Sequence, residues 1–152
     1  MRYILSLGGN LGDVEATMRS AIRRIAMLGI VPLESKVYES EPWGFEAKER
    51  FKNMTIELDT GLEPLALLDE LQRIEREMGR DHKTIDGQYQ SRNIDIDILL
   101  CDERVVDTER LTIPHKLMHL REFALAPTAE HWADWWHPIL GKTVGELLAQ
   151  LG

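Results

Sequence analysis

A strictly alternating segment near the middle of the chain limits the fold more than any other feature. Residues 94–98 read Ile-Asp-Ile-Asp-Ile, so in an extended chain the isoleucines take one side and Asp95 and Asp97 the other. β-Branched residues at every second position favour a strand over a helix. The two carboxylates would then lie on one face, roughly 6.5–7 Å apart along the strand. The segment therefore predicts a strand with one apolar and one acidic face.

The acidic pair has two interpretations. Like charges at this distance repel each other, which is unfavourable in a half-buried sheet unless something lies between them. A bound cation would remove the repulsion, and carboxylate oxygens suit Mg²⁺ better than Zn²⁺. Arg92, just before the strand, could hold an anion that the metal also binds. The alternative is a solvated sheet face that carries two aspartates without any ligand.

Composition indicates a single globular domain that spans residues 1–152. Its 43% apolar and 29% charged residues are ordinary for a soluble protein, and the net charge of −8 argues against a general nucleic-acid binder. No apolar run approaches roughly 18 residues, and the N-terminus does not resemble a signal peptide. The single cysteine, Cys101, excludes an internal disulfide and fits a reducing compartment. We therefore expect a cytoplasmic protein.

The predicted elements follow the order β-α-β-β-α-β, which fits an α+β, ferredoxin-like βαββαβ sandwich with an antiparallel sheet. A C-terminal extension with two short helices should cover part of the other sheet face, and its three tryptophans should serve packing. We expect Asp13 to cap the first helix and Thr143 to cap the last. Strands are predicted at 2–7, 31–39, 53–59 and 94–100, and helices at 14–28, 64–78, 118–125 and 143–151.

Four further segments carry groups that suit a ligand. The glycine-rich loop at 8–13 is a weak phosphate signal and is more typical of a strand-to-helix turn. Trp43, in a loop with Phe45, either stacks on a flat ligand or packs on the core. Glu75 falls inside the apolar stripe of the second helix, so it needs a salt bridge or a ligand. The cations of the polar loop at 80–88 are either solvated or face a ligand.

Taken together, the motifs resemble those of the 6-hydroxymethyl-7,8-dihydropterin pyrophosphokinase family of folate biosynthesis. The most specific stretch is Arg92–Leu99. Each of the other motifs is weak evidence alone, and the resemblance depends on their joint order along the chain. These motifs are Ser6–Asp13, Tyr38–Gly44, Phe51–Asn53, Leu71–Glu75 with Gly79–Arg80, Leu111–His115 and Arg121–Phe123.

The resemblance implies an enzyme that transfers pyrophosphate from ATP to the pterin hydroxymethyl group and releases AMP. It implies a pair of Mg²⁺ ions held by Asp95 and Asp97, with Arg80 and Arg92 as the other catalytic residues. The partners would be ATP and the hydroxymethyl pterin, for a monomer without nucleic-acid or membrane partners. Nucleotide contacts are implied for Gln72, Glu75, Arg92, Ile98, Arg110, Thr112, His115 and Arg121. Pterin contacts are implied for Gly8, Ser40, Glu41, Trp43, Phe51, Asn53, Tyr89, Asp95 and Phe123.

Some positions depart from the family pattern without touching the acidic pair. His82 stands where many relatives carry a second arginine, and Lys83 could take over its phosphate contact. Two other functions fit the same order of elements. An RNA-binding module would need aromatic residues on the third strand and a basic surface. A phosphohydrolase using the same aspartates would release phosphate or diphosphate from ATP with no pterin present.

Overall fold

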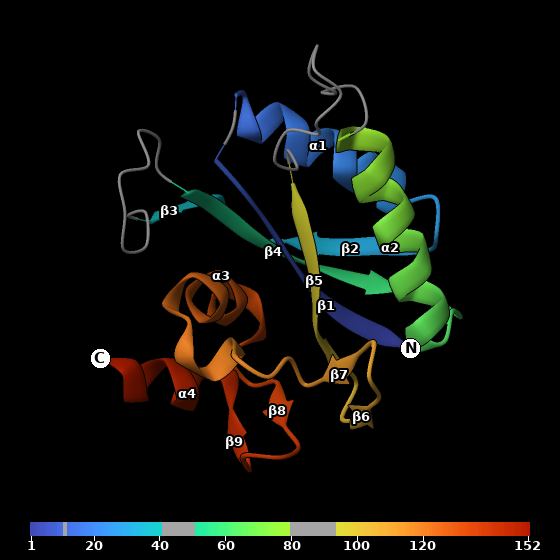
Figure 1. Cartoon of the computed structure of the whole chain (residues 1–152). Coiled ribbons are helices and arrows are strands. Elements are labelled where there is room, and N and C mark those ends of the chain that lie inside the picture. The colour runs from blue at the N-terminus through green and yellow to red at the C-terminus, as the bar shows by residue number, and fades with distance from the viewer. Residues whose placement is uncertain (11, 41–50, 80–93) are drawn as a thin grey trace.

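A computed structural model describes residues 1–10, 12–40, 51–79 and 94–152. Its centre is an antiparallel sheet in the order β2-β4-β1-β5, and a short strand β3 also pairs with β4 (Figure 1). This is the predicted mixed architecture of strands and helices with an antiparallel sheet. The strands are β1 (Arg2–Gly9), β2 (Ile30–Glu34), β3 (Tyr38–Ser40), β4 (Phe51–Asp59) and β5 (Asp95–Cys101).

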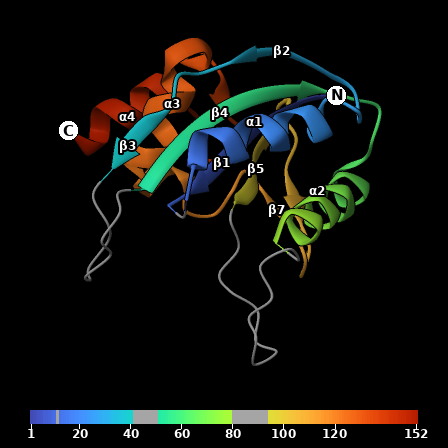
Figure 2. The same cartoon turned by 90° about the horizontal axis from the view of Figure 1, so that it is seen from above.

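Helices cover both faces of this sheet, as the two views together show (Figures 1 and 2). Helices α1 (Val14–Ile25) and α2 (Pro64–Gly79) lie on one face. Helix α3 (Glu122–Trp132) packs against β4 on the other face, and α4 (Val144–Leu151) packs against α3. The expectation that the C-terminal extension covers part of the second face is confirmed. The smaller elements are β6 (Val106–Asp107), β7 (Thr112–Ile113), the 3₁₀ turn η2 (Met118–Leu120), β8 (Trp136–His137) and β9 (Lys142–Thr143).

The main core lies between the sheet and helices α1 and α2. Every second residue of β1, β4 and β5 faces it, which confirms the predicted alternation on β4 and β5. Its sheet side includes Leu5, Leu7, Met54, Ile56, Leu58, Ile96 and Ile98, and its helix side includes Met18, Ile25, Leu67, Leu71 and Ile74.

A second apolar cluster lies under α3 and α4. The pairing of β1 with β5 shifts register between Ile4 and Leu5, so Leu99 and Leu100 both join this cluster, together with Ile4. A bulge of this kind inserts one residue and ends the regular alternation. Trp132 and Leu147 complete the cluster from the helices, which confirms a packing role for that tryptophan.

Two helix starts follow the sequence prediction, but the end of α1 does not. Asp13 accepts a hydrogen bond from the N–H of Ala16, and Thr143 forms a reciprocal capping box with Glu146. Helix α1 ends at Ile25, before the expected Leu28. Gly29 serves the approach of β4 rather than the helix end, because an added Cβ would lie 2.2 Å from the carbonyl oxygen of Asp59.

The predicted strand at 31–39 is wrong as a single element. It divides into β2 and β3 around Ser35, whose hydroxyl accepts a hydrogen bond from the N–H of Thr55 at 2.9 Å. The N–H of the next residue, Lys36, donates to the carboxylate of Glu130 on α3 at 3.2 Å. Side chains thus take part of the hydrogen bonding of the strand ladder there, although the N–H of Ser35 still donates to the carbonyl oxygen of Thr55. Alternation alone cannot reveal this.

The predicted helix at 118–125 is also divided. Arg121 has an extended backbone between η2 and α3, and α3 then continues to Trp132 with Pro127 inside it. The helix extends past this proline, where a sequence rule would have ended it. In the part of the chain that the structure describes, no helix is long and apolar enough to cross a membrane.

Candidate active site

Strand pairing gathers the predicted pterin and metal residues in one row across the sheet. Asn53 on β4 lies opposite Gly8 on β1, and Gly8 lies opposite Asp95 on β5. Thr55, Ser6 and Asp97 form the next row on the same face. Asn53 and Asp95 are two strand spacings apart, or roughly 10 Å. An amide and an acidic pair therefore flank a strand that carries no side chain at Gly8.

The amide end of the row is preformed. Asn53 is only 8% exposed, and its Nδ2 donates a hydrogen bond to Oγ of Ser40 at 3.5 Å. A Cβ at Gly8 would lie 2.5 Å from Oδ1 of Asn53, so only glycine lets the amide lie across β1. Phe51, opposite Ser40, occupies the same face. The arrangement presents a donor and an acceptor beside an aromatic ring, which suits a flat polar heterocycle.

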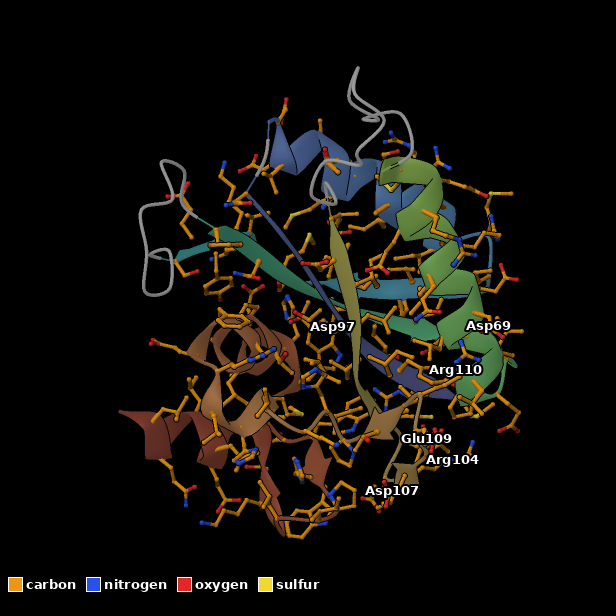
Figure 3. All side chains as sticks on the ribbon, viewed as in Figure 1. Asp69, Asp97, Arg104, Asp107, Glu109 and Arg110 are labelled. Atoms are coloured by element: carbon orange, nitrogen blue, oxygen red, sulfur yellow. The ribbon has the colours of Figure 1, made fainter. Side chains whose placement is uncertain are left out.

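The acidic end of the row is accessible. Asp95 and Asp97 are exposed, whereas Ile94, Ile96 and Ile98 are buried, which confirms the alternation predicted for this strand. Figure 3 shows Asp97 on the side of β5 that faces α3. Among the described residues, no group of three or more histidines, cysteines and carboxylates gathers around one point. An ion at the pair would therefore take further oxygens from a ligand and water, as Mg²⁺ commonly does with substrate phosphates.

Glu75 reaches the acidic strand from α2. It is 6% exposed, and its Oε2 accepts a hydrogen bond from the backbone N–H of Ile96 at 2.8 Å. The sequence predicted that this buried carboxyl would need a partner, and the structure supplies a backbone donor of β5. The implied nucleotide contact of Glu75 stays a prediction.

His115 and Arg121 lie near Asp97. The N–H of His115 donates to the carbonyl oxygen of Leu99 at 3.0 Å, which holds this segment along β5. Burial lowers the pKa of His115, and the charge of Arg121 acts in the same direction, whereas Asp97 opposes both. Nδ1 of His115 accepts from the N–H of Leu117 at 3.1 Å, so a neutral ring carries its proton on Nε2 and can donate it to a ligand. The guanidinium carbon of Arg121 lies 5.4 Å from the centre of the Phe123 ring.

Gln72 and Arg110, two further candidate nucleotide residues, meet on the α2 side of β5. Arg110 donates from Nη2 to Oδ1 of Asp69 at 2.6 Å and to Oε1 of Gln72 at 3.3 Å, and Figure 3 shows Arg110 and Asp69 pointing toward each other. Asp69 was not singled out from the sequence, although it lies one helical turn before Gln72. Thr112 is half-buried on β7, whereas Ile98 is buried in the main core. The implied nucleotide contact of Ile98 stays a prediction.

Five of the predicted site residues lie outside the described part of the chain. They are Arg80 and Arg92, predicted to be catalytic, and Glu41, Trp43 and Tyr89, predicted to contact the pterin.

A surface hollow of about 430 Å³ lies elsewhere, where α3 and the residues after it meet the start of β1. Arg2 lies 4.5 Å from the centre of the Trp135 ring and donates from Nε to Glu57 at 3.1 Å. The guanidinium of Arg2 is therefore already engaged by Trp135 and Glu57. None of the predicted site residues lines this hollow.

The face of β4 under α3 gives no support to the RNA-binding alternative. Thr55 and Glu57 are buried there, and the hydroxyls of Thr55 and Thr128 lie 2.9 Å apart in a hydrogen bond. Bases that stack on a sheet need an uncovered surface, which α3 removes from this part of the strand.

Comparison with known proteins identifies the family. The family model described as 7,8-dihydro-6-hydroxymethylpterin-pyrophosphokinase (HPPK) matches residues 4–133. The chain belongs to the HPPK family. It is 39% identical over 128 residues to a Bacillus subtilis 2-amino-4-hydroxy-6-hydroxymethyldihydropteridine pyrophosphokinase, across 83% of this chain and 75% of that protein. It is 40% identical over 136 residues to the Porphyromonas gingivalis protein of the same name, across 88% of this chain and 92% of that protein.

Solved structures of HPPK family members have the same fold. A Plasmodium falciparum HPPK-DHPS structure with pteroate superimposes with a TM-score of 0.77 at 15% sequence identity. The likeness covers 98% of this chain and 42% of that longer chain. At this identity it establishes the fold, and the similarity of function comes from the sequence relatives.

Proposed function

We propose that this protein transfers pyrophosphate from ATP to the hydroxymethyl group of 6-hydroxymethyl-7,8-dihydropterin, giving AMP and the pterin diphosphate, in folate biosynthesis. The observation that carries the proposal is the row Asn53, Gly8 and Asp95, in which a side-chain amide lies two strands from an acidic pair. The amide would suit a heterocycle, and the acidic pair would suit a metal–phosphate group. The row occurs in a chain whose relatives at about 40% identity are named for this activity.

The amide end would hold the pterin. Asn53 both donates and accepts, which matches the adjoining amide and amine groups of a pterin edge. Phe51 on the sheet and Phe123 on α3 would contact the ring, and Trp43 and Tyr89 would add aromatic surface. Ser40 supports the orientation of the Asn53 amide through its hydrogen bond.

The acidic end would hold Mg²⁺ through Asp95 and Asp97, because both carboxylates are exposed and both offer hard oxygen donors. Bound there, the metal would neutralise charge on the triphosphate and on the oxygens that carry charge during transfer. Asp95 belongs to the same row as Asn53, so the strand pairing would set the distance between the pterin and the metal.

The nucleotide would lie along β5 and β7. Arg110, Gln72 and Thr112 would contact it on the α2 side, and His115 and Arg121 would contact it beside Asp97. Arg80 and Arg92 would bind the phosphates. Catalysis would then come mainly from holding two substrates in line and from stabilising charge, because phosphoryl-type transfer needs little covalent participation by the protein.

The remaining parts of the proposal concern classification and setting. The strand order β2-β4-β1-β5, with helices between β1 and β2 and between β4 and β5, supports a ferredoxin-like sandwich with a C-terminal extension. We infer one domain over residues 1–152, acting as a monomer in the cytoplasm without nucleic-acid or membrane partners. The single cysteine and the net charge of −8 support this setting.

The deciding measurement is AMP formation from ATP and Mg²⁺, with and without the hydroxymethyl pterin. We expect AMP and the pterin diphosphate in equal amounts, only when pterin is present, and loss of turnover when the metal is chelated. Release of phosphate or diphosphate without pterin would favour a hydrolase. Absence of turnover with both substrates would reject the proposed transfer, and full turnover with chelator would reject the metal.

A further inference from the structure

A hydrogen bond between a side chain and the backbone joins the buried side of α2 to the strand that carries the acidic pair. Oε2 of Glu75 accepts from the N–H of Ile96 at 2.8 Å. Ile96 is the residue between Asp95 and Asp97. The contact therefore acts on the backbone unit that separates the two candidate metal ligands.

The contact lies on the outer edge of the sheet. β5 ends the strand order β2-β4-β1-β5 in the part of the chain that the structure describes, and its inner edge pairs Asp95 with Gly8 and Asp97 with Ser6. Successive N–H groups of a strand point to opposite edges. Because the N–H of Ile96 points at Glu75, those of Asp95 and Asp97 point at β1. The segment is thus held along both edges.

A carboxyl group is an unusual choice for the surroundings of Glu75. Its neighbours Leu71 and Ile74 on α2 are buried in the apolar core, where a polar side chain destabilises the fold unless it is hydrogen-bonded. An apolar residue would fill the stripe, but it would leave the edge N–H of Ile96 without this acceptor. Buried backbone donors are almost always paired in folded proteins.

We propose that Glu75 is a positioning residue for the acidic pair. By accepting from Ile96 it fixes the twist and depth of β5, so that Asp95 and Asp97 project together from the exposed face. The role in ligand binding rests on the proposed function, whereas the hydrogen bond itself does not. This assigns Glu75 a task on the side of the strand opposite the carboxylates, in addition to any contact with the nucleotide.

Two variants of similar size separate the acceptor from the shape of the side chain. Glu75→Met removes the acceptor, and Glu75→Gln keeps an amide oxygen that can accept from Ile96. Ile74→Val is the matched control, because it loosens the same helix without touching the N–H of Ile96. All three are compared with the wild type in the full-length protein.

The first readout is amide hydrogen exchange of Ile96, followed by NMR in protein free of metal and nucleotide. We expect exchange in Glu75→Met to be faster by about tenfold or more relative to Ile74→Val, because one hydrogen bond is lost locally. Glu75→Gln should keep most of the protection. Unchanged exchange of Ile96 in Glu75→Met would overturn the inference.

The second readout is calorimetric binding of Mg²⁺ together with a non-hydrolysable ATP analogue. Affinity should fall by about tenfold in Glu75→Met, with a smaller loss in Glu75→Gln and none in Ile74→Val. If Glu75→Gln protects Ile96 but loses as much affinity as Glu75→Met, the charge of Glu75 acts on the ligand and the positioning role is wrong. If exchange accelerates while binding stays at the level of Ile74→Val, the positioning role is also wrong.

These outcomes are separate from a failure of the proposed transfer. That failure would appear as a lack of pterin-dependent AMP formation by the wild type, whereas both readouts here are measured without turnover.

Discussion

The two faces of the central sheet use the same strands for different purposes. Toward α1 and α2, the strands present mainly apolar residues of the main core, such as Leu5 and Ile56, and Lys52 pairs with Glu15 of α1 at the start of β4. Toward α3, the alternate positions of the same strands present polar groups, among them Thr55, Glu57 and Asp97. One face therefore stabilises the sheet by burying apolar area, and the other holds groups that need hydrogen-bond partners.

The polar face is itself divided by α3. Where α3 covers it, two polar groups have partners on the helix: Thr55 bonds to Thr128, and Glu57 accepts from Nε1 of Trp132 at 3.0 Å. Beyond the helix, Asp95 and Asp97 are exposed. Residues on the same face of the sheet therefore have different tasks. Under α3 they stabilise the fold, and beyond α3 they are candidates for ligand binding.

The largest expected effect is loss of activity at the uncovered end. Asp97→Ala should lower kcat by about 1,000-fold or more, because it removes a carboxylate that would stabilise charge on the phosphates. The free energy of unfolding should change by no more than about 0.5 kcal/mol, since the side chain is exposed. Kinetics with ATP and pterin, and urea unfolding, measure the two quantities. Asp107→Ala, at another exposed aspartate, is the control, and near-normal kcat in Asp97→Ala would contradict the proposed site.

On the sheet face toward α1 and α2, we expect a loss of stability without a loss of activity. Ile56→Ala should lower the free energy of unfolding by about 2–5 kcal/mol, because it leaves a cavity in the main core. The folded fraction should keep its kcat. Urea unfolding measures the loss, and turnover per folded molecule tests the second part. A specific loss of kcat in this variant would break the separation between the two faces.

A smaller effect, on pterin binding, is expected where β1 passes beside the Asn53 amide of β4. Gly8→Ala places a Cβ 2.5 Å from Oδ1 of Asn53, so the amide must move. KM for the pterin should rise by about tenfold, corresponding to roughly 1.4 kcal/mol of lost binding. Steady-state kinetics at saturating ATP give this value. The control is Gly61→Ala, where an added Cβ meets no atom within 4 Å, and equal KM values for the two variants would exclude Gly8 from the pterin site.

The smallest effect is a pH dependence under α3. The neighbouring Glu57 carboxylate and burial together raise the pKa of Asp59 from 3.8 to about 6. Burial alone would raise the pKa of Glu57, but hydrogen bonds from Arg2, Asp59 and Trp132 outweigh it and lower that pKa to about 2. Near pH 5 the two groups thus share one proton, with Glu57 ionised and Asp59 protonated.

Because the folded pKa of Asp59 is the higher one, its contribution is complete below 3.8 and is lost as the pH rises through about 6. Asp59→Asn cannot titrate and its amide still donates to Glu57. The variant should therefore gain stability relative to the wild type between about pH 5 and 7, by at most about 1 kcal/mol because solvent screens this partly exposed group. Urea unfolding at several pH values tests this against Asp107→Asn, and a constant difference across this range would disprove the shared proton.

Elements whose signals are local could be predicted from the residues alone. The alternation around Asp95 and Asp97 gave the strand and its acidic face, the apolar spacing gave α1 and α2, and the capping residues Asp13 and Thr143 gave two helix starts. These features depend on side chains a few residues apart, whose periodicity follows from backbone geometry. Family motifs then indicated the activity.

Only the tertiary structure decided which groups meet across the chain. The division of the predicted second strand depends on Ser35 and on Glu130, whose carboxylate comes from a helix far along the sequence. The fit of Gly8 against Asn53, the pairing of Arg110 with Asp69, and the support of Ile96 by Glu75 likewise join distant segments. The physical reason is that hydrogen bonds and close packing depend on distances in space, which a single sequence does not encode locally.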